Sequence, residues 1–238
     1  MKKFSILSAR PRQSLRLVPV AAVVLWAALQ PLLAQTTRPT HPLTGRRVAG
    51  IPTDYTWLDR PGREADEQPE RALDLLKIGK GLVVADIGAG TGYMTVRLAR
   101  RVGPTGKVYA TDLLPQMLTI LKDRARQEKL PNIEVVRSLL SDARLPPSAI
   151  DLALLVDVYH EFWRPQDMLQ SIKRALKPGG RLVLLEYRKE DNRYPALSDH
   201  TMSVTEVRTE VEAEGYKFDH VFEELPSQHM IVFRKPSP

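Results

Sequence analysis

From residue 82 onward, short apolar runs alternate with longer segments in which apolar residues recur at helical spacing. The apolar runs are rich in Val, Leu and Ile without strict alternation, which is typical of strands covered on both faces. The pattern predicts strands at residues 82–86, 107–111, 133–137, 151–157 and 181–187. Between them it predicts helices at residues 91–102, 115–128 and 166–176. This alternation indicates a parallel sheet with right-handed crossover connections.

The rhythm changes after the fifth predicted strand. A helix is expected near residues 203–214, followed by strands near 217–223 and 228–234. Only a tight reversal fits between these two strands, so they are expected to form an antiparallel hairpin. The expected fold class is therefore α/β, a three-layer sandwich built on a seven-stranded, mostly parallel sheet with a C-terminal antiparallel hairpin.

The segment before the first strand has a different character. Residues 35–69 are polar and rich in turn residues, and residues 36–42 read as a linker. The bulky residues Tyr55, Trp57 and Leu58 indicate a segment that docks on the body, with a helix following at residues 65–76. Packing is favoured over a role as a lid for a ligand. The main domain is expected to span residues 70–238.

The first 34 residues resemble an export signal. A basic start ends at Arg16, and residues 17–34 form an almost wholly apolar run that ends in the small residue Ala34, the candidate cleavage point. An uncleaved membrane anchor is the alternative, because the run reaches the lower limit for spanning a bilayer. The protein is thus expected to be exported if the leader is cleaved, and membrane-anchored if it is retained.

The net charge of +7 lies mostly in this leader. Residues 1–34 carry five basic residues and no acid, so the remainder has a net charge of +2. The later basic stretch at residues 122–129 is interleaved with acids, as on a solvated helix face, and no nucleic-acid partner is expected. The chain has no cysteine, which excludes disulfides, thiolate metal sites and thiol nucleophiles.

A glycine-rich turn joins the first predicted strand to the first helix. Residues 83–93 read VVADIGAGTGY, with glycines at positions 88, 90 and 92. The dinucleotide fingerprint G-x-G-x-x-G needs its third glycine at position 93, where this chain has Tyr93. A nicotinamide oxidoreductase is therefore disfavoured, and the nucleotide loop G-x-x-x-x-G-K-[ST] is absent as well.

This turn resembles motif I of the class I S-adenosylmethionine-dependent methyltransferases, whose signature is acid-x-G-x-G-x-G. Other elements of that Rossmann-like family match over roughly residues 70–235, including the Pro178-Gly179-Gly180 turn, where glycine is expected to end the preceding helix. The resemblance implies S-adenosyl-L-methionine as cofactor. It implies binding by loop residues Asp86, Gly88, Ala89, Gly90 and Gly92.

Two further acidic positions match the family's cofactor contacts. Asp112 ends the second strand and, with Leu113 beside it, is implied to accept the ribose hydroxyls, unless it is only a solvated strand end. Ser141 and Asp142 follow the third strand, where the family's aspartate accepts from the adenine amino group. Asp142 could instead cap its own loop.

The loop after the fourth strand carries the candidates for catalysis. His160 and Glu161 could act as a base toward a hydroxyl or amine acceptor, although a structural hydrogen bond is the alternative for His160. Asp157 is implied to line the sulfonium side of the cofactor or to cap the loop. The resemblance implies in-line methyl transfer, in which the protein supplies positioning and a dry pocket.

The nature of the acceptor is constrained by what this loop lacks. The family's Asn/Asp-Pro-Pro-aromatic motif is absent after the fourth strand, which argues against nucleic-acid bases and protein amides. A catechol-type metal site is not favoured, because only Asp157, Glu161 and either Glu186 or His200 could contribute, so no metal is expected. A small-molecule acceptor is the main hypothesis.

The export signal leaves a second hypothesis open. S-adenosylmethionine is made in the cytoplasm, so its supply to an exported enzyme is in question. The alternative is a non-catalytic cofactor-binding or envelope interaction module that keeps the methyltransferase fold. The oligomeric state and the methylated atom are not indicated by the sequence.

Overall fold

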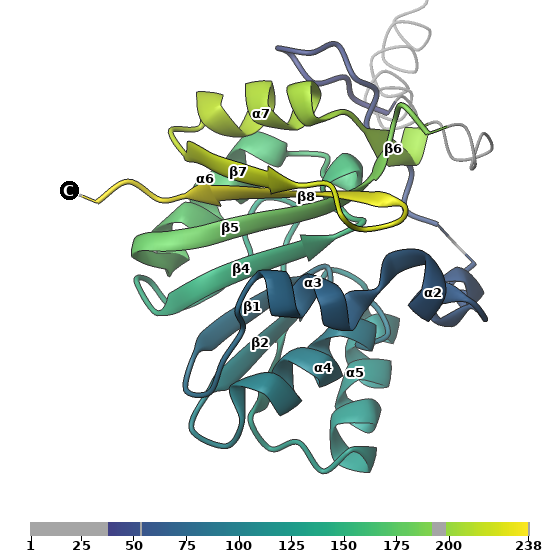
Figure 1. Ribbon diagram of the computed structural model, residues 1–238, viewed down its shortest axis with the longest axis vertical. Coiled ribbons are helices and arrows are strands. Elements are labelled where there is room, and N and C mark those ends of the chain that lie inside the picture. Colours follow the sequence, from purple (N-terminus) through teal and green to yellow (C-terminus); the bar gives the residue numbers. More distant parts are fainter. Residues whose placement is uncertain (1–37, 53, 192–198, 238) are drawn as a thin grey trace, which may run out of the picture. The chain divides into compact units, whose positions relative to one another are not determined.

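The computed structural model describes residues 38–52, 54–191 and 199–237 (Figure 1). The leader predicted at residues 1–34, its candidate cleavage point Ala34 and the first linker residues lie outside these ranges. Within them, no helix combines the length and the apolar character needed to cross a membrane.

A central sheet organises the described part of the chain. Its strands follow the order β3-β2-β1-β4-β5-β8-β7, in which β1 to β5 are parallel and β8 runs antiparallel to both β5 and β7. The strands are β1 Val83–Ile87, β2 Lys107–Asp112, β3 Ile133–Arg137, β4 Ile150–Val156, β5 Leu176–Arg188, β7 Lys217–Phe222 and β8 Gln228–Arg234. The predicted parallel sheet and terminal hairpin are confirmed.

An eighth strand was not expected. Strand β6, Thr201–Met202, pairs in parallel with the end of β5 at Tyr187 and Arg188. Two residues are too short a run to produce a periodic signal in the sequence. This pairing brings the residue just before β6, His200, to the carboxyl end of the sheet.

Helices on the two faces of the sheet complete the three layers. They are α3 Pro69–Leu75, α4 Tyr93–Val102, α5 Pro115–Gln127, α6 Pro165–Ala175 and α7 Val204–Ala213. Successive residues of a strand point to opposite faces of the sheet, so Val84 packs against α4 and the preceding helix α3, and Ala85 packs against α6 and α7 (Figure 1). The predicted three-layer sandwich is confirmed.

The turn before β5 differs from the prediction. Helix α6 ends at Ala175, and Leu176 is already extended because its backbone pairs with Ile150 at the start of β4. Gly179 therefore does not end the helix as expected. The residues between Leu176 and Arg181 form an irregularity in the pairing of β5 with β4.

The helix predicted at residues 65–76 is broken in two. Helix α2 spans Arg63–Glu67 and α3 spans Pro69–Leu75, after a short 3₁₀ turn, η1, at Thr56–Asp59. The break falls at Gln68, which has a φ of 46°. Proline disfavours the α conformation in the residue before it, so Pro69 forces this interruption.

The described start of the chain packs on the body. Val48 N–H donates to the Pro39 carbonyl, and His41 is buried, so the end of the segment expected to be a linker is docked. Arg46 donates to both carboxylate oxygens of Glu210 on α7 and to the carbonyl of His160.

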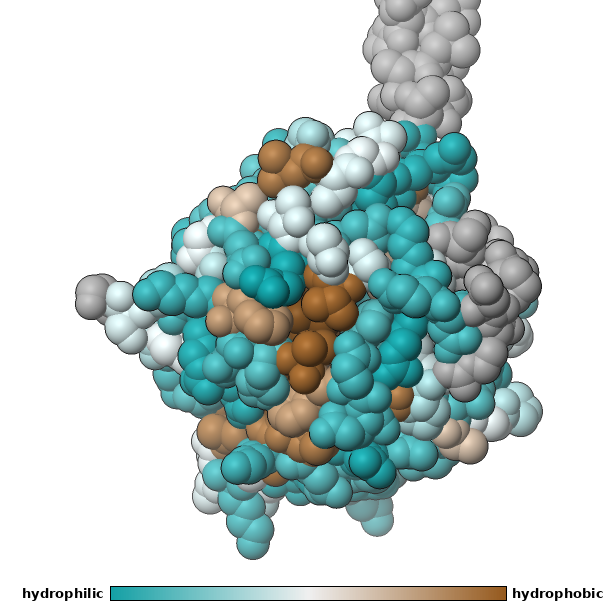
Figure 2. All heavy atoms as spheres, turned by 45° about the horizontal axis from the view of Figure 1, so that its top comes forward, coloured by the Kyte–Doolittle hydropathy of each residue, from teal (hydrophilic) through white to brown (hydrophobic). Residues whose placement is uncertain are grey.

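Figure 2 shows a largely polar face of the molecule, with apolar side chains gathered near its centre.

Candidate functional site

The glycine-rich turn after β1 lies where backbone and neighbouring side chains come very close. A Cβ added at Gly88 would lie 2.5 Å from Cγ2 of Val158, and one at Gly90 would lie 3.0 Å from Leu58. Both glycines have positive φ angles, of 70° and 54°. Glycine suits the backbone conformation at both positions, and at Gly88 it also avoids a clash with Val158, so the turn presents bare backbone at the carboxyl end of the sheet.

Asp112 is fixed beside this turn. It ends β2, and its Oδ2 accepts from Gly90 N–H while its Oδ1 accepts from Leu114 N–H, both at 2.9 Å. Burial raises the pKa of Asp112, and these backbone donors oppose that rise. Each carboxylate oxygen retains a free lone-pair direction, so the group can still accept hydrogen bonds from a ligand.

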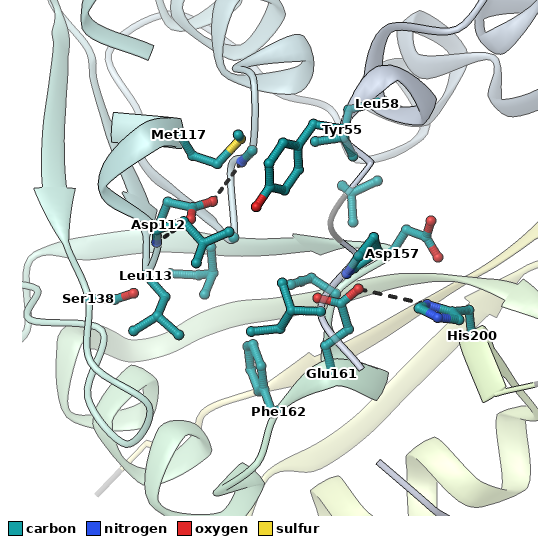
Figure 3. A pocket seen from close by; sticks show the side chains of 18 of the residues that line it. Tyr55, Leu58, Asp112, Leu113, Met117, Ser138, Asp157, Glu161, Phe162 and His200 are labelled. Carbon is teal, nitrogen blue, oxygen red and sulfur yellow. Dashed lines mark hydrogen bonds and ion pairs between the residues drawn. The ribbon is translucent and has the colours of Figure 1, made fainter. Parts of the chain in front are cut away.

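Asp112 opens onto a cavity of about 390 Å³, within the usual range of ligand pockets. Figure 3 shows its two ends: Asp112, Leu113 and Ser138 lie at one, and Glu161 and His200 lie at the other. Most of the remaining lining is apolar or aromatic. It includes Ile51, Pro52, Tyr55, Trp57, Leu58, Met117, Leu139, Leu140, Phe162, Trp163 and Met168.

The wall between the two ends comes from the segment before the first strand. Tyr55, Trp57 and Leu58 all line the cavity, so these residues do more than pack on the body. The guanidinium of Arg60 lies 3.9 Å from the centre of the Trp57 ring. Arg60 also donates to Glu67 and to the hydroxyl of Tyr187, which ties this wall to β5.

Three of the predicted turn residues support the loop from outside the cavity lining. Asp86 is buried at the end of β1 and accepts a 2.5 Å hydrogen bond from the Thr95 hydroxyl on α4. Ala89 N–H donates to the Thr111 carbonyl. A Cβ at Gly92 would lie 2.8 Å from Leu121 on α5, so this glycine permits close helix packing. Gly88 and Gly90 are the turn positions that face the cavity.

The loop after β3 is arranged differently from the expectation. Asp142 Oδ1 accepts from Arg144 N–H at 2.8 Å and from the Ser171 hydroxyl at 2.7 Å. The Ser171 bond is the main cause of its lowered pKa. Ser141 and Asp142 lie outside the cavity lining, to which the same loop contributes Ser138, Leu139 and Leu140. An adenine contact by Asp142 stays a prediction. The hydrogen bond from Arg144 N–H is the one that the loop-capping alternative requires.

Asp157 lines the cavity at the end of β4, as expected. Its φ is 52°, and among the described residues its buried Oδ1 has no hydrogen-bond partner. Burial raises its pKa to about 7, against the nearby His160. A buried carboxylate without a donor at one oxygen is costly, which marks this position as one suited to a cationic neighbour.

His160 lies behind the cavity wall. Its ring is fully buried, with Nδ1 2.6 Å from Glu186 Oε2 and Nε2 3.0 Å from His200 Nδ1. Burial lowers the pKa of His160, but Glu186 outweighs it and the net value is about 9. The ring therefore reaches the cavity through His200, and in this part of the site the cavity is lined by Glu161 and His200.

Glu161 and His200 share the end of the cavity opposite Asp112. Burial raises the pKa of Glu161 to about 8, and burial lowers the pKa of His200. Glu161 Oε1 lies 3.7 Å from His200 Nδ1 (Figure 3). The sequence pointed to His200 only as a weak metal ligand, because forty positions separate it from His160 and β6 alone brings them together.

Comparison with known families and curated proteins gives a consistent result. Residues 84–180 match the family model of a methyltransferase domain. The chain is 30% identical over 152 residues to a ubiquinone/menaquinone biosynthesis C-methyltransferase of Pseudomonas putida, covering 61% of this chain and 59% of that protein. For its counterpart in Pseudomonas fluorescens the identity is 34% over 122 residues, covering 51% and 48%. The chain thus spans about half to three fifths of the length of these relatives.

Solved structures match a larger share of this chain than these relatives do. A SAM-dependent methyltransferase from Aquifex aeolicus superposes with a TM-score of 0.73 at 27% identity, covering 78% of this chain and 99% of that one. The [4+2]-cyclase SpnF superposes with a TM-score of 0.62 at 17% identity, covering 90% and 95%, which shows the fold alone. The family match includes the glycine turn and Asp112, whereas the Tyr55–Leu58 wall and His200 lie outside it.

Proposed function

Because the chain belongs to the class I S-adenosylmethionine-dependent methyltransferases, we propose that its cavity binds S-adenosylmethionine and transfers the methyl group to a small-molecule acceptor. One observation carries the proposal. The Asp112 carboxylate is held by the backbone of the glycine turn and opens onto the cavity with lone pairs to spare.

The residues at this end suit the cofactor. Asp112 can accept hydrogen bonds from the ribose hydroxyls, and the apolar side chains of Leu113 and Met117 can cover the adenine ring. Gly88 and Gly90 line the cavity, where a ligand can approach a backbone that carries no Cβ. When bound, S-adenosylmethionine supplies a methyl group on a sulfonium, which a nucleophilic acceptor atom displaces in line.

The opposite end supports an acceptor with a flat apolar body and a hydroxyl group. Phe162, Trp163 and Tyr55 provide aromatic walls that exclude water. Glu161 and His200 lie where a hydroxyl proton could be removed, which would leave the acceptor oxygen, or a ring carbon conjugated to it, nucleophilic. The names of the curated relatives favour methylation at carbon on a hydroxylated ring.

A turnover assay with a probe of this class tests the proposal. The full chain is incubated with S-adenosylmethionine and 1,4-naphthoquinol, and S-adenosylhomocysteine release is measured by mass spectrometry. We expect the wild type to release S-adenosylhomocysteine. The control variant Asp123→Asn, which changes an exposed carboxylate on α5, should release it as well. Asp112→Asn should lose at least about tenfold in kcat/KM.

The outcomes separate the parts of the proposal. Cofactor binding without release would contradict the acceptor class and favour a non-catalytic binding module. A folded chain that neither binds nor turns over the cofactor would contradict the function itself.

A further inference from the structure

Three potential metal ligands converge at the acceptor-facing end of the cavity. They are Nε2 of His160, Oε1 of Glu161 and Nδ1 of His200. His160 Nε2 lies 3.0 Å from His200 Nδ1 and 3.8 Å from Glu161 Oε1, and the third side of this triangle is 3.7 Å. The residues come from the loop after β4 and from the start of β6.

The size of this triangle matches a small divalent cation. A point in its plane lies about 2 Å from each of the three atoms, which is the distance at which Zn²⁺ is held by histidine nitrogen and carboxylate oxygen. Two imidazoles and one carboxylate are a ligand set that holds Zn²⁺ as well as Fe²⁺. Three protein ligands with one open position are usual at catalytic zinc sites.

A hydrogen-bonded network explains this arrangement less well. One shared proton would account for the 3.0 Å separation between the two histidine nitrogens. The Glu161 oxygen, however, is too far from either nitrogen for a hydrogen bond, and it is nearly equidistant from both. Equal separations of this length are what three groups around a common centre produce.

Glu186 supports the same interpretation. It is fully buried on β5, and its Oε2 lies 2.6 Å from Nδ1 of His160, the nitrogen that faces away from the triangle. Its Oε1 accepts from Tyr159 N–H, which fixes the carboxylate. Metal-bound histidines regularly donate their second N–H to such a carboxylate, which sets the tautomer and orients the ring.

The charges around the cluster also favour a cation. The carboxylates of Asp157, Glu161 and Glu186 gather around His160. Binding of a divalent ion displaces the proton from His160, and the ion then takes the place of the imidazolium in offsetting the charge of these carboxylates.

From this geometry we infer that His160, Glu161 and His200 bind a Zn²⁺ ion, whose open position faces the acceptor end of the cavity. The ion would coordinate the acceptor hydroxyl and lower its pKa, so that the hydroxyl releases its proton to bulk water near neutral pH. Glu161 and His200 would then act as ligands of the ion in place of removing the proton themselves. This role toward the acceptor rests on the proposed function, whereas binding of the ion itself does not. The sequence predicts no metal, because its candidate ligands lack the spacing of a catechol-type site. The pairing of β6 with β5 is what brings His200 next to His160.

Metal titration of the full chain tests this site. The protein is stripped with a chelator, titrated with Zn²⁺ by calorimetry, and titrated with Co²⁺ while visible absorption is followed. We expect one equivalent of each ion and cobalt bands of a low-coordinate nitrogen and oxygen site. His200→Ala and Glu161→Gln should each weaken Zn²⁺ binding by at least about 100-fold, and Glu186→Gln by about 10–100-fold.

His220→Ala is the matched control, because His220 lies half exposed on β7 and outside the cluster. It should leave Zn²⁺ affinity unchanged, and circular dichroism of each variant establishes that it is folded. Absence of stoichiometric binding by the wild type, or equal affinity of His200→Ala and the wild type, would overturn the inference. Titration of the metal-free protein with S-adenosylmethionine distinguishes failure of the metal site from failure of the proposed function, since cofactor binding should persist without metal.

Discussion

Asp86 and Asp112 end neighbouring strands, and their carboxyl groups meet different surroundings. Asp112 receives two backbone N–H groups and opens onto the cavity, whereas Asp86 is buried beneath the glycine turn with the Thr95 hydroxyl as its donor. The motif alone placed both in contact with the cofactor. Only the packing of α4 against β1 distinguishes the carboxylate that opens onto the cavity from the one that supports the turn.

The surroundings of Asp86 predict a pH-dependent stability. Burial raises its pKa from 3.8 to about 6, more than the Thr95 bond lowers it. A raised carboxyl pKa favours the folded state at low pH, so this contribution is complete below about pH 4 and is lost as the pH rises through about 6. The loss is about 2–3 kcal/mol.

Asp86→Asn removes this titration. The free energy of unfolding of the wild type, measured by urea denaturation at pH 4 to 8, should fall relative to that of the variant between pH 4 and 6. A constant difference across this range would contradict the assignment.

Gly88 is predicted to be intolerant of any side chain. In Gly88→Ala the new Cβ is strained by the positive φ and also clashes with Val158. In Gly45→Ala it is strained by the positive φ alone, because no atom lies within 4 Å of the new Cβ. We expect Gly45→Ala to cost about 1 kcal/mol and Gly88→Ala about 2–4 kcal/mol in urea denaturation. Adding Val158→Ala to Gly88→Ala should recover part of the difference, and equal costs for the two single variants would contradict the steric account.

At the scale of elements, the cavity wall depends on one buried carboxylate. Glu67 at the end of α2 accepts from Arg63 and Arg60 and from the hydroxyl of Tyr187 on β5. Arg63 also donates to the carbonyl of Leu58, so the network reaches the residue that covers Gly90. The interruption at Gln68 places Glu67 at a helix end, where it can face this network.

Glu67→Gln should therefore loosen the wall selectively. Two arginines would lose a buried charged partner, and we expect the chain to lose about 2–4 kcal/mol of stability. Hydrogen exchange should increase in residues 55–67 and stay unchanged in α6. Glu70→Gln removes partly exposed ion pairs on the next helix and should cost at most about 1 kcal/mol. Equal effects of the two variants would contradict a special role for Glu67.

At the scale of the whole molecule, the sequence predicted the helices and strands that a periodic pattern of apolar residues encodes. The Val- and Leu-rich runs located β1 to β5, β7 and β8 within a few residues, and the glycine spacing with Asp112 located one end of the cavity. Two features escaped prediction because they arise from local geometry or tertiary pairing. Pro69 acts on the conformation of Gln68, and the two-residue β6 gives no pattern although it delivers His200 to the cavity.

Localisation is a further whole-molecule prediction. The basic start and the apolar run of residues 17–34 support cleavage after Ala34. Intact mass measurement of the protein purified from its native host should then give a chain that begins at Gln35. An intact mass that retains the leader, in the membrane fraction, would favour the anchor instead.

Calorimetric titration of the full chain with S-adenosylmethionine tests the central claim most directly. We expect one equivalent to bind the wild type and the Asp123→Asn control with the same affinity. Asp112→Asn should weaken binding by about 10–100-fold, because it removes a charged acceptor worth about 1.5–3 kcal/mol. Absence of binding by folded wild-type protein, or an unchanged affinity in Asp112→Asn, would contradict the account.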